Sequence, residues 1–143
     1  MILWDVNILV YAFRSDSPLH SEARNCVEGT LSEAAAFLYC PSIAASFLRL
    51  VTNARIFLTP SDLGEGWMFL DYLERRPSAY FADIDERTYA LFRHLTFVAG
   101  SRGNDVPDAL LAATALRHDA LLVTADTALS RFPGLSIKLV GKS

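Results

Sequence analysis

Near its start the chain reads Ile2-Leu3-Trp4-Asp5-Val6-Asn7, a short apolar run that ends on a carboxylate and a carboxamide. The apolar half predicts a buried strand, and the apolar residues from Ile8 to Phe13 predict a short helix directly after it. A carboxylate beside core-forming residues is costly to bury unless it is paired or binds a metal ion. The segment therefore predicts the first strand of a fold and the first member of a polar site.

The same arrangement, an acid at the edge of an apolar run, occurs twice more. Asp108 heads the alanine-rich segment 108–113, and Asp126 ends Leu121-Leu122-Val123-Thr124-Ala125-Asp126. Asp5 and Asp126 would follow strands, at the edge where α/β sheets collect ligands, and Asp108 would lie in the first turn of a helix. We expect the three acids to meet at one rim and hold a divalent cation such as Mg²⁺, which prefers oxygen ligands. Each acid also has a simpler explanation, as a helix cap or a helix-dipole partner.

Strand-like and helix-like segments alternate along the rest of the chain. Strands are expected at 2–4, 36–40, 78–82, 121–124 and 136–139, and helices at 8–13, 17–33, 41–52, 59–76, 85–98, 107–118 and 127–131. Ser17 is the expected cap of the second helix, and Thr59-Pro60-Ser61-Asp62 resembles a capping box. This alternation predicts an α/β fold, a mostly parallel central sheet with helices on both faces. The length of 143 residues, without a linker, predicts one domain over 1–143.

Composition excludes several classes of protein. A hydrophobic fraction of 52% predicts a compact globular chain. A net charge of −3 argues against a general nucleic-acid coat, although a metal held by acids can still attract phosphate locally. No apolar run approaches the ~20 residues of a membrane span, and no basic segment precedes the first apolar run as in a signal peptide. Cys26 and Cys40 lack metal-site spacing, so we expect free thiols in a cytoplasmic protein.

Four blocks in one order carry a resemblance to a known family. They are Leu3 to Ala12, Phe47 to Phe57, Asp108 to Ala115, and Leu122 to Asp126 followed by Arg131-Phe132-Pro133-Gly134-Leu135. Together they resemble the PIN-domain family, and within it the VapC-type ribonuclease toxins of bacterial toxin–antitoxin pairs. The resemblance covers nearly the whole chain and implies a PIN-like three-layer α/β/α fold.

The resemblance also implies an activity, partners and a site. The activity would be Mg²⁺- or Mn²⁺-dependent endoribonuclease cleavage by a toxin, with RNA as substrate, a VapB-like antitoxin as partner and a homodimer as assembly. Asp5, Asp108 and Asp126 would bind the metal, and Asn7 and Thr124 would orient the ligands or water. Amide and hydroxyl side chains suit that orienting role because they hydrogen-bond carboxylates.

One departure from the family pattern concerns the site. Many members carry a glutamate where this chain has Ser46, so one candidate ligand or base is missing. Asp105 is a possible substitute carboxylate, or simply a loop acid or cap before the next helix. A second departure, Ala128-Leu129 in place of Asp-Phe, removes a peripheral acid. The serine leaves an alternative open, a catalytically weak PIN-fold module that binds RNA or protein.

Binding of RNA requires positive charge beside the metal, and the candidates are Arg14, Arg49, Arg55 and Arg102. A solvated surface position is the simpler explanation for Arg55 and Arg102, so Arg14 and Arg49 are favoured. Large apolar residues are more numerous than a small core needs, and we expect most of them in the core and a remainder in an interface patch. They are Trp67, Met68, Phe69, Tyr72, Tyr80, Phe81, Tyr89, Phe92 and Phe97.

Overall fold

The structure, a computed structural model, describes residues 1–141. Its centre is a five-stranded sheet in the order β3-β2-β1-β4-β5, and every pairing in it is parallel. The strands are β1 (Ile2–Trp4), β2 (Phe37–Tyr39), β3 (Ala79–Phe81), β4 (Leu121–Thr124) and β5 (Ile137–Leu139). The predicted parallel α/β sheet is therefore confirmed.

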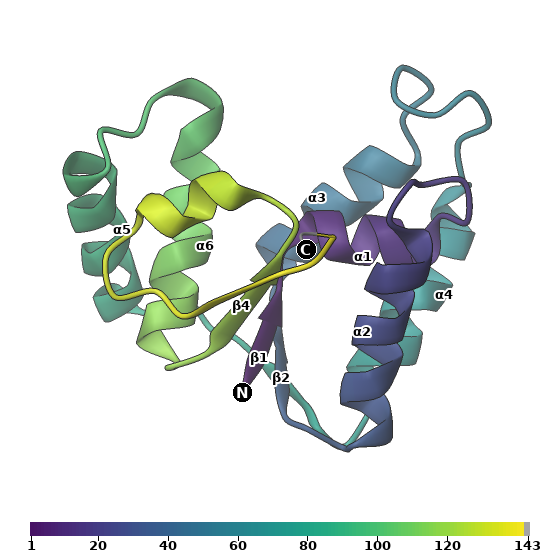
Figure 1. The fold of residues 1–143 in the computed structure, drawn as a ribbon, viewed down its shortest axis with the longest axis horizontal. Coiled ribbons are helices and arrows are strands. Elements are labelled where there is room, and N and C mark those ends of the chain that lie inside the picture. Colours follow the sequence, from purple (N-terminus) through teal and green to yellow (C-terminus); the bar gives the residue numbers. More distant parts are fainter. Residues whose placement is uncertain (142–143) are drawn as a thin grey trace.

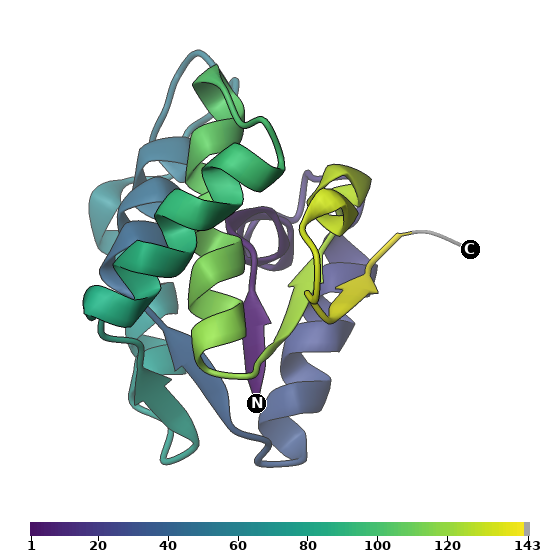
Figure 2. The same ribbon diagram turned by 90° about the vertical axis from the view of Figure 1, so that its left-hand side faces the viewer.

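Helices cover both faces of this sheet. They are α1 (Val6–Phe13), α2 (His20–Ser32), α3 (Pro41–Val51), α4 (Leu63–Glu74), α5 (Glu86–Val98) and α6 (Val106–Arg117), with the 3₁₀ turns η1 (Gly103–Asp105) and η2 (Thr127–Arg131). Helices α1 to α4 lie on one side of the strands and α5 and α6 on the other (Figure 1). Figure 2, seen from the α5–α6 side, places these two helices in front of the sheet. The predicted three-layer α/β/α arrangement is confirmed.

The two faces of the sheet follow from the alternation of side chains along each strand. Leu3 is paired in register with Leu38 and Leu122, and all three lie in the core shared with α5 and α6. Trp4 and Val123, one position later, lie in the core on the side of α1 to α4. On the first side α6 contributes small, fully buried side chains, which let this helix pack closely on the strands: Ala109, Ala112, Ala113 and Ala115.

The path of the chain defines where a ligand site is expected. From β1 the chain moves to β2 and β3 on one side, and it later returns to β4 and β5 on the other side. The direction of winding therefore reverses between β1 and β4, and ligands of parallel α/β sheets bind beyond the carboxyl ends of the strands at such a point. Among the described residues, no helix is both long enough and apolar enough to cross a membrane.

Two predicted helix starts were wrong. Helix α2 begins at His20, after the expected Ser17 cap, because the Ser17 hydroxyl donates instead to the Arg14 carbonyl oxygen at 2.7 Å. That bond closes a turn between α1 and α2. Helix α4 begins at Leu63 and not at the expected Thr59 capping box, because Asp62 is its cap: the Asp62 carboxylate accepts from the Glu65 backbone N–H at 2.9 Å.

The expectation for the large apolar residues was also wrong. Most of them are exposed, and only Phe69 and Phe92 are half-buried. They belong to α4, the edge strand β3 and α5, which are the outermost elements, with no further layer of the described chain over them. The core is filled instead by the strands, by α1, α3 and α6, and by smaller side chains on the inner faces of α2, α4 and α5, such as Val27, Leu70 and Leu95.

Candidate active site

The three predicted acids lie at the carboxyl end of the sheet. Asp5 follows β1 and Asp126 lies two residues after β4, and these strands are neighbours in parallel register. The backbone N–H of Asp5 donates to the Val123 carbonyl oxygen at 2.8 Å, which extends the pairing to the start of the site. Asp108 reaches the same end because α6 starts there and runs back along the sheet into β4 (Figure 1).

Asp5 is 7% exposed and is held by two side chains. The Thr124 hydroxyl donates to Asp5 Oδ2 at 2.7 Å, and the Asn7 carboxamide donates to the same oxygen at 3.2 Å. Asn7 also accepts from the backbone N–H of Ala125 at 3.3 Å, which ties it to the segment after β4. Asp5 occupies the cap position of α1 but makes no capping bond with its side chain, so capping alone does not account for it.

Thr124 is fully buried at the centre of this network. Its oxygen also accepts from the backbone N–H of Asp126 at 3.0 Å and lies 3.4 Å from the Asn7 nitrogen. One hydroxyl thus links β4 to both residues of the β1 end. The orienting role expected for Asn7 and Thr124 stays a prediction, and their contacts are the ones such a role requires.

Asp108 and Asp5 line one hollow together with Ser46. Ser46 comes from α3 and is half-buried, so the position that carries glutamate in many family members faces the same hollow as the acids. The Asp108 carboxylate accepts from the Arg131 guanidinium at 3.3 Å. Arg131 also forms a 3.8 Å ion pair with the exposed Asp105, which joins Asp105 to the edge of the site.

Burial and like charge together disfavour ionised acids here. Burial raises the pKa of Asp5, the Thr124 hydrogen bond opposes that rise, and the charges of Asp108 and Asp126 add to it. Burial also raises the pKa of Asp108, the Arg131 contact lowers it, and Asp126 and Asp105 raise it. Since neighbouring carboxylates contribute to the raised pKa values of Asp5 and Asp108, these acids lie within range of one another's electrostatic repulsion.

Asp126 has a capping role as well. Its Oδ1 accepts from the backbone N–H of Ala128 at 2.9 Å at the start of η2.

Among the described residues, no three acidic, histidine or cysteine side chains lie close enough together to form a complete metal site by themselves. The donor chemistry nevertheless fits a hard cation. The hollow has mostly apolar walls, but the carboxylates of Asp5 and Asp108 and hydroxyls such as that of Ser46 also line it, and the two acids repel one another.

The two arginines proposed for RNA binding differ in their surroundings. The Arg14 side chain is 11% exposed and pairs with Asp16 at 2.7 Å. It also donates to the Ser61 hydroxyl at 2.9 Å and lies over the Phe57 ring. These contacts occupy its guanidinium and hold the 57–61 loop against α1, which favours a structural role. Arg49 is exposed on α3, and the role of both in RNA binding stays a prediction.

Sequence reasoning missed Arg131 as a site residue. The sequence indicates Arg131 only as part of the fourth block, because nothing in its spacing from Asp108, 23 residues earlier, indicates contact.

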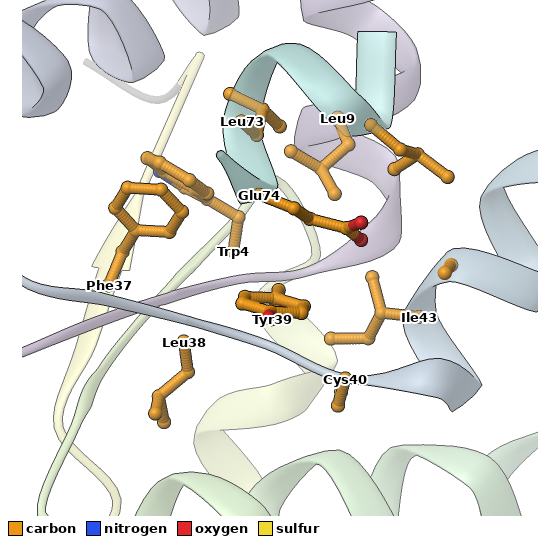
Figure 3. Close-up of a pocket in the computed structure, with 11 residues that line it drawn as sticks. Trp4, Leu9, Phe37, Leu38, Tyr39, Cys40, Ile43, Leu73 and Glu74 are labelled. Atoms are coloured by element: carbon orange, nitrogen blue, oxygen red, sulfur yellow. The ribbon is translucent and has the colours of Figure 1, made fainter. Parts of the chain in front are cut away.

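A second pocket lies on the opposite face of the sheet, and Glu74 of α4 turns its carboxylate into this pocket above Tyr39 (Figure 3). Burial, and secondarily the charge of Asp71, raises the pKa of Glu74.

The fold and the site define a class, the parallel α/β proteins with an acidic site where the winding of the sheet reverses. Comparison with known proteins identifies the family. The PIN domain profile matches residues 2–135, so the chain belongs to the PIN domain family. It is 36% identical over 132 residues to the VapC ribonuclease Mb2897 of Mycobacterium bovis, covering 92% of this chain and 90% of that protein. It is also 36% identical to ribonuclease VapC31 of Mycobacterium tuberculosis, covering 92% and 93%.

Solved structures agree on the fold. The chain superposes on a chain of VapBC2 from Rickettsia felis, a complex bound to a promoter DNA fragment, with a TM-score of 0.72 and 19% identity over 98% of this chain and 99% of the other. A chain of VapBC-1 from nontypeable Haemophilus influenzae matches with a TM-score of 0.66 and 15% identity, covering 97% and 98%.

Proposed function

We propose that this PIN domain is a divalent-metal-dependent endoribonuclease and the toxin of a toxin–antitoxin pair. The observation that carries the proposal is the convergence of Asp5, Asp108 and Asp126 at the winding reversal between β1 and β4, where the pKa values of Asp5 and Asp108 are raised by burial and respond to neighbouring acids. The proposal is supported by relatives named VapC ribonucleases at 36% identity over nearly the whole chain.

In this proposal Asp5 and Asp108 hold a Mg²⁺ or Mn²⁺ ion, with Asp126 completing the acidic set. Mg²⁺ commonly takes one or two protein carboxylates and fills its remaining positions with water and substrate phosphate, which suits acids that do not form a complete cage. When bound, the ion supplies charge neutralisation at the phosphate and lowers the pKa of water. The chain's part is to fix the direction of the carboxylates, and Thr124 and Asn7 do so for Asp5.

The remaining positions have supporting roles. Ser46 adds a hydroxyl to the hollow in place of a carboxylate, and Asp105 places a charge at its edge. Arg49, exposed on the helix that carries Ser46, is the better of the two candidates for contacting the RNA backbone, since Arg14 is engaged inside the protein.

The partners follow from the same proposal. A VapB-like antitoxin is expected because the matched solved structures are VapBC complexes, and a homodimer is expected from the family resemblance. The exposed apolar side chains of α4, including Trp67, Met68 and Tyr72, provide surface for a protein partner. We place the protein in the cytoplasm, where its RNA substrate is, as one domain over 1–143.

The test is cleavage of a mixed RNA pool by purified protein free of antitoxin, in Mg²⁺, in Mn²⁺ and in EDTA. Asp108→Asn removes a proposed ligand with little change in shape, and Asp71→Asn, at a surface acid on α4 that pairs with Arg75 at 3.8 Å, is the matched control. We expect metal-dependent cleavage by the wild type and Asp71→Asn, and at least a hundredfold loss in Asp108→Asn, since an electrostatic contribution of this kind is worth ~3–4 kcal/mol. Equal cleavage by Asp108→Asn would refute the site.

Ser46 motivates a second candidate, a weakly catalytic PIN module that acts by binding RNA or protein. The two candidate functions differ in whether growth arrest of cells that express the protein depends on the Asp108 carboxylate. Growth arrest by the wild type that disappears with Asp108→Asn favours the nuclease, whereas growth arrest that persists with this variant favours the binding module.

A further inference from the structure

Arg131 is the cation of the acidic site. It is the last residue of η2, and its Nη2 lies 3.3 Å from Asp108 Oδ2 and 3.8 Å from Asp105 Oδ1. The Arg131 side chain is 26% exposed and that of Asp108 is 28% exposed, so this contact is sheltered from solvent more than an ordinary surface pair.

The position of Arg131 does not depend on the acids alone. Its Nη1 donates to the Ala128 carbonyl oxygen at 2.6 Å, and its guanidinium lies 4.5 Å from the centre of the Phe132 ring. Phe132 and Leu129 are buried in the core against α6, which fixes the turn that carries the arginine. The guanidinium is therefore held at the acidic hollow by its own turn.

That turn is itself joined to the site. Asp126 caps η2 through the Ala128 backbone N–H, and the Thr124 hydroxyl holds the Asp126 backbone N–H. A connected path thus runs from Asp5 through Thr124 and Asp126 to Arg131, and Arg131 returns it to Asp108.

The charges around the hollow are unequal in number. Four carboxylates contribute negative charge here: those of Asp108 and Asp126 raise the pKa of Asp5, and those of Asp126 and Asp105 raise the pKa of Asp108. Within residues 1–141, the ion pairs made by these acids involve Arg131 and no other cation. Arg131 therefore contacts one of the two oxygens of the Asp108 carboxylate, Oδ2, and places a positive charge beside a proposed metal ligand.

We infer that Arg131 is a built-in counter-cation that competes with the divalent metal for Asp108 and so lowers the metal affinity of the site. This inference rests on the proposed function, and it makes Arg131 a positioning residue that acts through Asp108. A unit positive charge within several ångströms of a doubly charged ion, across a partly solvated site, changes the affinity about tenfold. Loss of the charge should therefore tighten binding.

The test is a Mn²⁺ titration of the purified full chain by calorimetry, which needs no RNA and no cleavage. Arg131→Gln should bind Mn²⁺ about tenfold more tightly than the wild type, and Arg131→Lys, which keeps the charge, should remain near the wild type. Arg117→Gln is the matched control, because Arg117 is also an arginine contacting an acid, Asp85 at 2.8 Å, but at the other end of α6. Equal or weaker Mn²⁺ binding by Arg131→Gln overturns the inference.

A second measurement uses the unaltered protein in case Arg131→Gln does not fold. Competition is reciprocal, so metal binding must weaken the Arg131 contact with Asp108. In a Mg²⁺ titration followed by NMR, the Arg131 side-chain Nε–H signal should shift with the same midpoint as metal binding, while the Arg117 signal stays in place. An unmoved Arg131 signal at saturating Mg²⁺ overturns the inference.

These outcomes are separable from failure of the proposed function. Absence of Mn²⁺ binding in every variant, the wild type included, would overturn both the inference and the metal site. Binding that is equal in the wild type and Arg131→Gln, together with cleavage lost in Asp108→Asn, would overturn only the role of Arg131.

Discussion

Replacement of Thr124 by valine removes one hydroxyl from the centre of the site while keeping the shape of the side chain. Thr124 is fully buried, so no water replaces its oxygen. The Asp5 carboxylate loses a 2.7 Å charge-assisted hydrogen bond, and the Asp126 backbone N–H loses its 3.0 Å acceptor.

The expected loss in the free energy of unfolding follows from these two hydrogen bonds. A bond to a charged group contributes ~1.5–3 kcal/mol and a neutral one ~0.5–1.5 kcal/mol, so Thr124→Val should lower the free energy of unfolding by about 2–4.5 kcal/mol. For a chain of 143 residues, the entropy of unfolding is about 0.3 kcal/mol per kelvin, and this loss corresponds to a Tm lowered by about 7–15 °C.

The assay is thermal and urea unfolding in EDTA, with Thr124→Ser as the control. Serine keeps the hydroxyl and loses one methyl group, which costs about 1 kcal/mol. The difference in the free energy of unfolding between Thr124→Val and the wild type should also depend on pH. Because the hydrogen bond from Thr124 lowers the pKa of Asp5, the folded-state pKa of Asp5 lies further above 3.8 in the variant than in the wild type. The extra destabilisation of the variant therefore grows as the pH rises from the folded-state pKa of Asp5 in the wild type to that in the variant. A Thr124→Val protein as stable as Thr124→Ser at pH 7 would refute this account of the network.

Two further predictions concern the rest of the fold. Glu74→Gln should raise the Tm at pH 7, because the folded-state pKa of Glu74 is raised and its ionisation opposes folding; the gain should vanish below about pH 4.5, where the carboxyl is protonated in both states, and a gain that persists there would contradict the charge explanation. Gly66→Val should lower the free energy of unfolding by about 1–3 kcal/mol, because a Cβ there would lie 2.7 Å from Leu48 Cδ2 between α4 and α3. Gly64→Ala, whose Cβ would meet only Asp62 at 3.6 Å, should stabilise the helix by about 0.5–1 kcal/mol, and urea unfolding that ranks the two variants in the opposite order would refute this packing argument.

The sheet could be predicted because its strands carry short-range signals. β1 and β4 are apolar runs that end at polar residues, and this pattern depends only on neighbouring positions. The placement of Asp5 and Asp126 at the carboxyl edge followed from the same signal, since it needed only the strand ends and a parallel arrangement.

The features that sequence reasoning missed depend on contacts between distant segments. Arg131 reaches Asp108 because η2 folds back on α6 after β4, and Arg14 is occupied by Ser61 from a loop 47 residues later. The exposure of Tyr80 and Phe81 depends on β3 being an edge strand, which the order of strands determines. None of these follows from the residues near each position.

The most direct test of the proposed metal site is anomalous X-ray diffraction from crystals of the full chain soaked in Mn²⁺. We predict a peak in the hollow beside Asp5, Asp108 and Ser46, with carboxylate oxygens of Asp5 and Asp108 at about 2.1 Å, the usual length of a bond to a small divalent cation. Absence of a peak there at Mn²⁺ concentrations that support RNA cleavage, or a peak bound by other residues, would contradict the account.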